Sequence, residues 1–258
     1  MIDLTNGLPA EQSIRHYIEF GDFHSAKFGL HLHERTAITP TEKEVVAAIP
    51  YRQGVVDLSA ITGRRIYNNR TITYVFYRFG VDEADVNAYQ TTIENLLMRE
   101  FNQKLQESSD PEFHYRGKCR EVIVEDDYAF RRLRVQIEFD LYPFKISNRW
   151  ESTDLFDPLN LDLDAIQDDL RVTFNFAAHK EEEIQLFNAG KNSLQPTIQT
   201  NGDGLWIRRG DSIWQLDSGK PGRKYEGFRL LPGMNRLYIG HATGGLATVS
   251  FDWKKELI

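Results

Sequence analysis

The chain has 258 residues, of which 41% are hydrophobic and 27% are charged, and its formal net charge is −7. This length suits one large domain or two ordinary ones, and the composition allows each to bury a core. The acidic balance argues against tight binding to DNA or to anionic membranes, because affinity for phosphates depends on lysine and arginine.

Short strands are predicted in the first 80 residues, where large and polar side chains alternate. Residues 28–33 are expected to form a strand, residues 36–44 a polar loop, and residues 45–50 a short apolar strand closed by proline. The clearest pattern is that of residues 65–78, because β-branched and aromatic side chains dominate there, as in a half-buried strand.

One strong helix is predicted to follow these strands. Asp82 suits the N-cap position, and Glu83 and Asp85 lie in the first turn, where the helix dipole favours anions. Apolar side chains then recur three or four residues apart along one stripe, at Val86, Tyr89, Ile93, Leu96, Leu97, Phe101 and Leu105. The stripe predicts a helix of about six turns, which the turn-forming residues 108–111 end.

A long hairpin is predicted next, with strands at residues 113–124 and 130–141 around an acidic turn at residues 125–127. The second strand sorts its side chains by face. One face carries Val135, Ile137, Phe139 and Leu141, and the other carries Arg134, Gln136, Glu138 and Asp140. Such alternation indicates a sheet that has one face on the core and the other in solvent.

A domain boundary is expected near residue 150, because residues 147–164 are acidic, irregular and interrupted by Pro158. It divides the chain into domains 1–150 and 151–258. The second half alternates short strand patterns with turn signals such as residues 201–204, which is typical of a β-sandwich. The expected fold is therefore mainly β with one long helix: an N-terminal β-sandwich plus helix and hairpin, then a C-terminal β-sandwich.

No group of residues assembles a recognisable catalytic site. His31 and His33 would share one face of a strand and could ligate a metal ion, but the sequence nominates no third ligand. A single cysteine, Cys119, permits neither an internal disulfide nor a cysteine-ligated cluster, and is expected to be buried. Phosphate-binding glycine loops and the nucleophile elbow of hydrolases are missing. No signal peptide and no apolar run long enough to cross a membrane is found.

Runs of charge have ordinary explanations. The carboxylates of residues 125–127 and 181–183 are adjacent in sequence, whereas glycosidase chemistry needs two that face each other across a sugar. Asp154, Asp157, Asp162 and Asp164 lack the pattern of a known calcium loop. Arg131, Arg132 and Arg134 fit a solvent face or a subunit contact. We expect no catalytic, cofactor-binding or metal-ligating residue, and so no enzyme and no cofactor.

Two tryptophans in the second half allow a different function. Aromatic side chains on a β-sandwich can stack against sugar rings, so Trp206 and Trp214 make a carbohydrate-binding module possible. Core packing is the commoner explanation, because most aromatic residues of sheets are buried. The sequence leaves both interpretations open.

Short motifs along nearly the whole chain resemble those of the distal tail (Dit) proteins of long-tailed siphophages. They are residues 28–30 (Phe-Gly-Leu), 49–54 with 57–58, the helix after residue 82, 140–145, 188–190 with 196–198, 230–235 and 250–253. One departure is Tyr51, where the resemblance predicts glycine after the proline. Another is the short second domain, which has no room for an inserted carbohydrate-binding module.

This resemblance implies a virion protein of the tail tip, assembled in the host cytoplasm. The first domain would form a ring, usually a hexamer, whose channel lets DNA pass. The second would be galectin-like, generally without the galectin sugar site, and would hold receptor-binding or baseplate proteins, while the ring meets the major tail protein and tape-measure proteins. The alternative is a carbohydrate-binding adhesion module of the cell surface.

The residues themselves are compatible with a ring. A helix with one apolar stripe covers one face of a sheet, and long hairpins leave edges that can pair with a neighbour. Residues 36–44 are expected to act as an arm that reaches an adjacent subunit. An acidic channel lining would repel DNA and so let it slide through.

Overall fold

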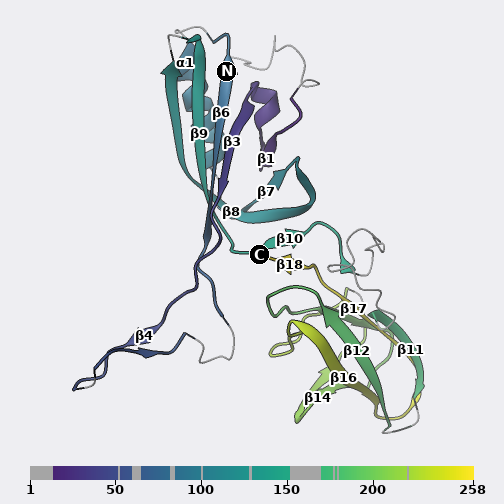
Figure 1. The fold of residues 1–258 in the computed structure, drawn as a ribbon. Coiled ribbons are helices and arrows are strands. Elements are labelled where there is room, and N and C mark those ends of the chain that lie inside the picture. Colours follow the sequence, from purple (N-terminus) through teal and green to yellow (C-terminus); the bar gives the residue numbers. More distant parts are fainter. Residues whose placement is uncertain are drawn as a thin grey trace. The chain divides into compact units, whose positions relative to one another are not determined.

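Figure 1 shows a computed structural model of the chain. It describes residues 14–51, 53–59, 65–81, 85–99, 101–127, 130–151, 170–176, 178, 180–219 and 221–258. The chain divides into two compact units, Met1–Lys145 with Ile258 and Ile146–Leu257. The fold is mainly β, as predicted, and the described residues contain one α-helix, α1 (Val86–Met98). None of the described helices is long and apolar enough to span a membrane.

Seven strands of the first unit follow one another in the order β2-β1-β7-β8-β9-β6-β3. Their bounds are Ile18–Phe20 (β1), Phe23–His24 (β2), His31–Ala37 (β3), Arg70–Phe79 (β6), Gln103–Glu107 (β7), Asp110–Asp127 (β8) and Arg132–Leu141 (β9). The long strand β8 changes partner at Gly117, which is paired with Gln103 of β7 and with Leu141 of β9. A side chain at this glycine would come within 2.2 Å of the Asp140 carbonyl oxygen.

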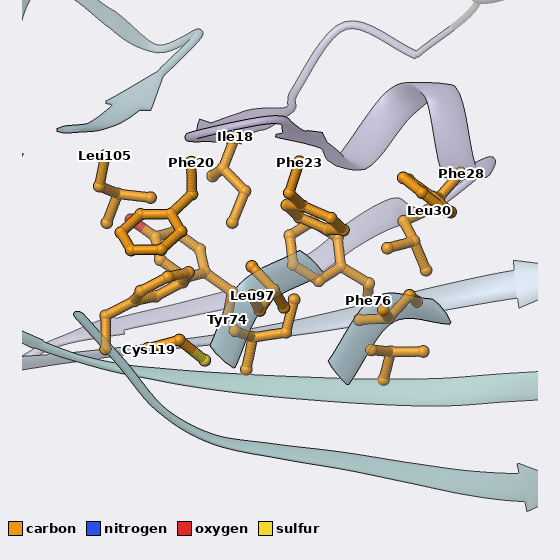
Figure 2. Close-up of a cluster of buried hydrophobic side chains, with 14 of the residues drawn as sticks. Ile18, Phe20, Phe23, Phe28, Leu30, Tyr74, Phe76, Leu97, Leu105 and Cys119 are labelled. Carbon is orange, nitrogen blue, oxygen red and sulfur yellow. The ribbon is translucent and has the colours of Figure 1, made fainter. Parts of the chain in front are cut away.

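One hydrophobic core fills the first unit. Figure 2 shows the side chains of β1, β2 and the following 3-10 turn η2 (Ser25–Phe28) packed against those of β6, α1, β7 and β8. The helix contributes Tyr89, Ile93 and Leu97, which are fully buried. The amphipathic pattern of this helix was therefore predicted correctly for its central turns.

The predicted hairpin is confirmed as β8 and β9. Leu133, Val135, Ile137, Phe139 and Leu141 are fully buried, so the apolar face lies on the core. The predicted acidic turn is wrong, because Glu125, Asp126 and Asp127 continue β8 and pair with β9. The connection between the two strands lies beyond them.

The predicted helix is too long. It ends at Met98; Phe101 is 85% exposed, and Asn102 adopts a left-handed conformation with φ 53°. Leu105 belongs instead to β7, and residues 108–109 form the turn between β7 and β8 rather than a helix stop. Asp82 and Glu83, the expected N-cap and first-turn residues, lie outside the described residues.

The expected polar loop at residues 36–44 is part of a two-stranded arm, here residues 38–69. Ile38 donates its amide hydrogen to Thr71 O, and amide hydrogen bonds run on through Asn68 to Thr41 O and Lys43 to Ile66 O. The pair continues as β4 (Val46–Ala47) and β5 (Val56–Asp57), visible as a narrow hairpin in Figure 1. The strand predicted at residues 28–33 begins only at His31, because Phe28 closes η2.

The second unit is a β-sandwich, as predicted. Its sheets have the orders β11-β17-β13 and β12-β16-β14-β15. Their bounds are Arg171–Phe176 (β11), Glu181–Asn188 (β12), Thr197–Thr200 (β13), Leu205–Arg209 (β14), Ser212–Leu216 (β15), Gly233–His241 (β16) and Gly245–Asp252 (β17). Side chains from both sheets form one core. Two short strands, β10 (Lys145–Ser147) and β18 (Glu256–Leu257), pair with each other.

Candidate interaction surfaces

The arm exposes an unusual amount of apolar surface. Of the seventeen large hydrophobic side chains that are exposed in the described residues, seven lie on the arm. These are Ile38, Val45, Val46, Ile49, Tyr51, Val55 and Ile66. A soluble monomer rarely leaves so many apolar side chains together in water, and clusters of this kind mark contacts with other proteins.

Polar contacts hold the arm together in place of a core. The Val45 amide donates to Ser59 Oγ at 2.7 Å, and the Ser59 amide donates to Asp57 Oδ1 at 2.8 Å. The hydrogen bonds from Ser59 lower the pKa of the Asp57 carboxyl. Asn68 Nδ2 donates to Thr41 Oγ1 at 3.1 Å across the two strands. The arm is thus ordered by its backbone ladder, while its apolar side chains stay available.

Tyr51 lies near the tip of the arm and is fully exposed. Its φ is 64°, a left-handed conformation that costs a residue with a Cβ roughly 1–2 kcal/mol. The resemblance predicts glycine at this position, and glycine adopts such a conformation without that cost.

The base of the arm is fastened by a buried network. Arg35 of β3 donates from Nε and Nη2 to the Glu107 carboxylate of β7, at 2.5 and 3.0 Å, and the Tyr74 hydroxyl of β6 donates to the same carboxylate. Burial, followed by the negative charge of Glu107, raises the pKa of Tyr74 well above its usual value. Burial alone would lower the pKa of Arg35, but Glu107 raises it. The local sequence does not mark Glu107, because its partners Arg35 and Tyr74 are distant in sequence.

His31 and His33 share the exposed face of β3, as predicted. Their rings lie 5.7 Å from that of Phe79 and 4.9 Å from that of Tyr77, respectively. Among the described residues, no group of three or more His, Cys, Asp or Glu side chains is placed to hold a metal ion. Cys119 is buried, and burial raises the pKa of its thiol to about 12, so the reactive thiolate is scarce at neutral pH.

The charged residues of the hairpin pair with one another across the sheet. Arg134 donates to Glu125 at 2.8 Å and Arg132 donates to Asp127 at 2.8 Å. The sheet face opposite the core therefore carries both signs of charge in matched pairs. Arg131, the third arginine of this group, adopts a left-handed conformation in the turn before β9. The aspartates at 154, 157, 162 and 164 lie outside the described residues.

Trp206 and Trp214 lie on opposite faces of one sheet. Trp214 is paired with Ile207, which belongs to the core, and its ring packs against buried Phe228 at 5.1 Å. Trp206 alternates with the core residues Leu205 and Ile207, so its indole lies on the outer face. The core-packing interpretation therefore fits Trp214, whereas Trp206 lies outside the core.

Trp206 is held within a small cluster on that outer face. Its Nε1 donates to Glu181 Oε1 at 3.3 Å, and Arg208 donates from Nε to the same oxygen at 2.8 Å. The Arg208 guanidinium lies 4.6 Å from the centre of the Tyr238 ring. The hydrogen bond from Arg208 lowers the pKa of Glu181. The sequence alone does not group these residues, because they come from three strands, β12, β14 and β16.

One solved structure shares this architecture. The crystal structure of the Dit (gp 19.1) protein of phage SPP1, described as a paradigm of the hub adsorption apparatus in phages infecting Gram-positive hosts, aligns with a TM-score of 0.58 and 13% identity. The alignment covers 93% of this chain and 98% of that one. The chain has the fold of the SPP1 Dit protein.

Two structures of the phage p2 baseplate in its activated conformation, with Sr and with Ca, align more weakly. Each has a TM-score of 0.39 and 8% identity; the alignments cover 94% and 93% of this chain and 99% and 97% of the baseplate chains. No family model and no curated protein matches the sequence. The Dit resemblance suggested by short motifs is thus matched at the level of the fold.

Proposed function

We propose that this chain is a structural protein of a phage tail tip, a hub that assembles into a ring of six copies. The fold that it shares with the SPP1 Dit protein over nearly the whole of both chains supports this role. The observation that carries the ring is the arm, whose apolar side chains have no core of their own. Full burial of an exposed aliphatic side chain is worth about 1.5–3 kcal/mol. Because most of these side chains are about half exposed, each would contribute roughly half of that to a contact with an adjacent subunit.

A free strand edge gives the ring a second contact. β3 ends the strand order of the first unit, and among the described strands it pairs only with β6. Unpaired edges are templates for pairing with another chain. The arm continues from β3, so one neighbouring subunit can meet both features. Arg35 and Glu107 stiffen this region, which favours a defined geometry of assembly.

The remaining roles follow from a ring at the tail tip. DNA passes through the channel in transit, the first domain meets the major tail protein and tape-measure proteins, and the galectin-like second domain, residues 151–258, holds receptor-binding or baseplate proteins. The protein acts as a virion component rather than an enzyme. Matched charge pairs such as Glu125–Arg134, if they line the channel, offer DNA little net attraction.

Mass photometry and negative-stain microscopy of the purified chain test this proposal. We expect particles of six copies with a central hole. The double variant V46D/I66D, which places charges on exposed arm positions, should be folded but monomeric, because a charge in an apolar contact is costly. Leu246→Asp is the control: it charges an apolar residue of β17 that is even more exposed (74%) and lies outside the arm, and its rings should persist. A monomeric wild-type chain, or arm variants that still form rings, would overturn the proposal.

A further inference from the structure

An exposed aromatic cluster lies at the end of the first sheet that is opposite to the arm. It comprises His31, Tyr77, Phe79, Phe130 and Arg132, here the end patch. His31 begins β3, Phe79 ends β6 and Arg132 begins β9, so the end patch gathers at one end of three neighbouring strands. Phe79 is 58% exposed and Phe130 is 69% exposed. Covering two such rings removes a large apolar area from water, which favours a contact with another molecule.

The end patch lies on the face of the sheet that the core does not cover. Strand pairing places His31 opposite Tyr77, and directly opposed residues share a face. Phe79 is opposite Arg132 in the same way. Phe76 alternates with the two aromatic residues of β6 and is fully buried in the core. The rings of the end patch therefore do not belong to the interior of this unit.

Contacts within the end patch hold it in one arrangement. The Arg132 guanidinium lies 4.3 Å from the centre of the Tyr77 ring and 4.8 Å from that of Phe130. Arg132 Nε also donates to Asp127 Oδ2 at 2.8 Å, which balances its charge. An ordered surface loses little conformational entropy on binding, and aromatic residues with arginine are typical of the centres of protein interfaces. Because its cation is paired with a carboxylate, the end patch suits a protein better than a polyanion such as DNA.

The arm has a face that suits such a surface. Ala47 is paired with Val56. The Leu58 amide donates to Val45 O, which pairs these two residues as well. Paired residues share a face, as do residues two apart on a strand, so these four aliphatic side chains lie on one face of the hairpin. Asp57 lies on the other face. The aliphatic face can thus lie flat against aromatic rings.

The two surfaces lie at opposite ends of one strand pair. The arm continues from the end of β3 and the start of β6, whereas the end patch lies at the start of β3 and the end of β6. The ten residues of β6 separate them by roughly 30 Å. The arm therefore leads away from the end patch of its own chain. Two different surfaces at opposite ends of a subunit suit head-to-tail contacts, which generate closed rings when the rotation between subunits allows it.

We propose that the end patch receives the arm of an adjacent copy of this chain. In each contact the aliphatic face of the arm lies against Tyr77, Phe79 and Phe130 of the neighbour. Each subunit gives its arm to one neighbour and accepts the arm of the other. His31 begins β3, whose free edge belongs to the proposed ring contact, so the end patch is continuous with that surface. This assignment rests on the proposed ring and identifies the second half of its interface.

The double variant F79D/F130D tests this contact by mass photometry. Both side chains are exposed, so the chain should fold. The number of copies found in rings should fall by about tenfold or more, because charges in an apolar contact are costly. M98D/F101D is the matched control: Met98 and Phe101 are exposed apolar residues of the same unit, outside both the arm and the end patch, and its rings should persist. Circular dichroism checks that both variants are folded.

Mixing two defective variants tests the head-to-tail direction of the contact. F79D/F130D keeps an intact arm, and V46D/I66D keeps an intact end patch. A mixture of the two can therefore form one arm-to-patch contact per pair of chains, which does not close a ring. We expect heterodimers, although each variant alone is monomeric. A heterodimer also shows that F79D/F130D is folded.

The outcomes separate this contact from the hub itself. Rings of F79D/F130D as abundant as those of the wild type, or a mixture that stays monomeric, would overturn the proposal. In either case wild-type rings would still support the hub. A wild-type chain that forms no rings would instead overturn the hub and this contact together.

Discussion

The strand pair that begins as β3 and β6 in the sheet continues into the arm, but its apolar side chains are buried only in the sheet. Within the sheet, β3 and β6 pair and the β6 residues Ile72, Tyr74 and Phe76 are fully buried. In the arm, backbone hydrogen bonds continue between the same two stretches of chain, yet Ile66 is 46% exposed. The difference is a second layer: α1 and β1 cover the sheet, whereas the described part of the arm contains only its two strands.

This difference separates two properties that usually occur together. Backbone pairing orders a hairpin. Its apolar side chains stabilise the fold only when an opposing layer removes them from water. The arm therefore exposes apolar side chains whose burial would stabilise a contact with another protein. In the proposed ring, a neighbouring subunit supplies the missing layer.

Truncating one isoleucine in the sheet and one in the arm tests this difference in stability. Ile72→Ala should lower the free energy of unfolding by about 2–5 kcal/mol, because it leaves a cavity in a packed core. Ile66→Ala should change it by no more than about 0.5 kcal/mol, because Ile66 is 46% exposed and belongs to neither hydrophobic core. Urea unfolding at a concentration where the chain is monomeric measures both. Equal losses would show that the arm has an internal core.

The buried network at the base of the arm should matter more than a surface ion pair. Glu107→Gln removes the charge that Arg35 and Tyr74 share, and should cost about 2–3 kcal/mol, since Arg35 is partly exposed and keeps some hydration. Glu125→Gln, which breaks the exposed pair with Arg134, should cost less than about 1 kcal/mol. Thermal unfolding of the two variants tests this order, and a larger loss in Glu125→Gln would contradict it.

Alkaline pH should weaken the first unit through Cys119. The folded thiol keeps its proton up to a pKa of about 12, whereas its ordinary pKa is 9.0. Between these values the unfolded chain loses this proton first, so stability falls as pH rises, by at most about 1.4 kcal/mol per pH unit. Urea unfolding at pH 9 and pH 10 should show this slope in the wild type and a flatter one in Cys119→Ala. Parallel slopes would show that the thiol does not contribute.

The smallest expected effects concern the tip of the arm. Tyr51→Gly should stabilise the hairpin by about 0.5–1 kcal/mol, because glycine adopts φ 64° without steric cost. Gly54→Ala should destabilise it by a similar amount, since Gly54 has φ 80° although the space around it is open. Hydrogen exchange of the Leu58 amide, which donates to Val45 O, reports both changes. Exchange that responds to neither variant would mean that the tip does not limit opening of the arm.

The sequence predicted the fold best where one periodicity held without interruption. The alternation through residues 133–141 placed β9 correctly, because every inward side chain is apolar. The helix was extended too far, because Leu97, Phe101 and Leu105 are spaced four apart by coincidence. Strand β7 is not predicted by the sequence, because its second inward residue is the charged Glu107. Hydrogen bonds from Arg35 and Tyr74 allow this carboxylate to be buried. Such a strand looks polar in sequence, because the residues that pair with its buried carboxylate lie on other strands.

The surfaces were predictable to a smaller extent. An arm was expected at residues 36–44, but its length and apolar content depend on pairing between distant segments, such as Lys43 with Ile66. Trp206 was identified as a candidate, yet its separation from Trp214 required the register of β14 and β15. The local sequence does not single out Glu181, because it meets Trp206 and Arg208 only through the pairing of separate strands.

Gly117 has a consequence for how this protein can evolve. Any other residue there would push a side chain into the backbone of β9, so substitution would separate β8 from one of its two partners. Related sequences should tolerate substitutions at exposed positions of β8 but should retain glycine at position 117. In a lineage whose sequences diverge quickly, this one position should mark the junction of the two hairpins long after the surrounding residues have changed beyond recognition.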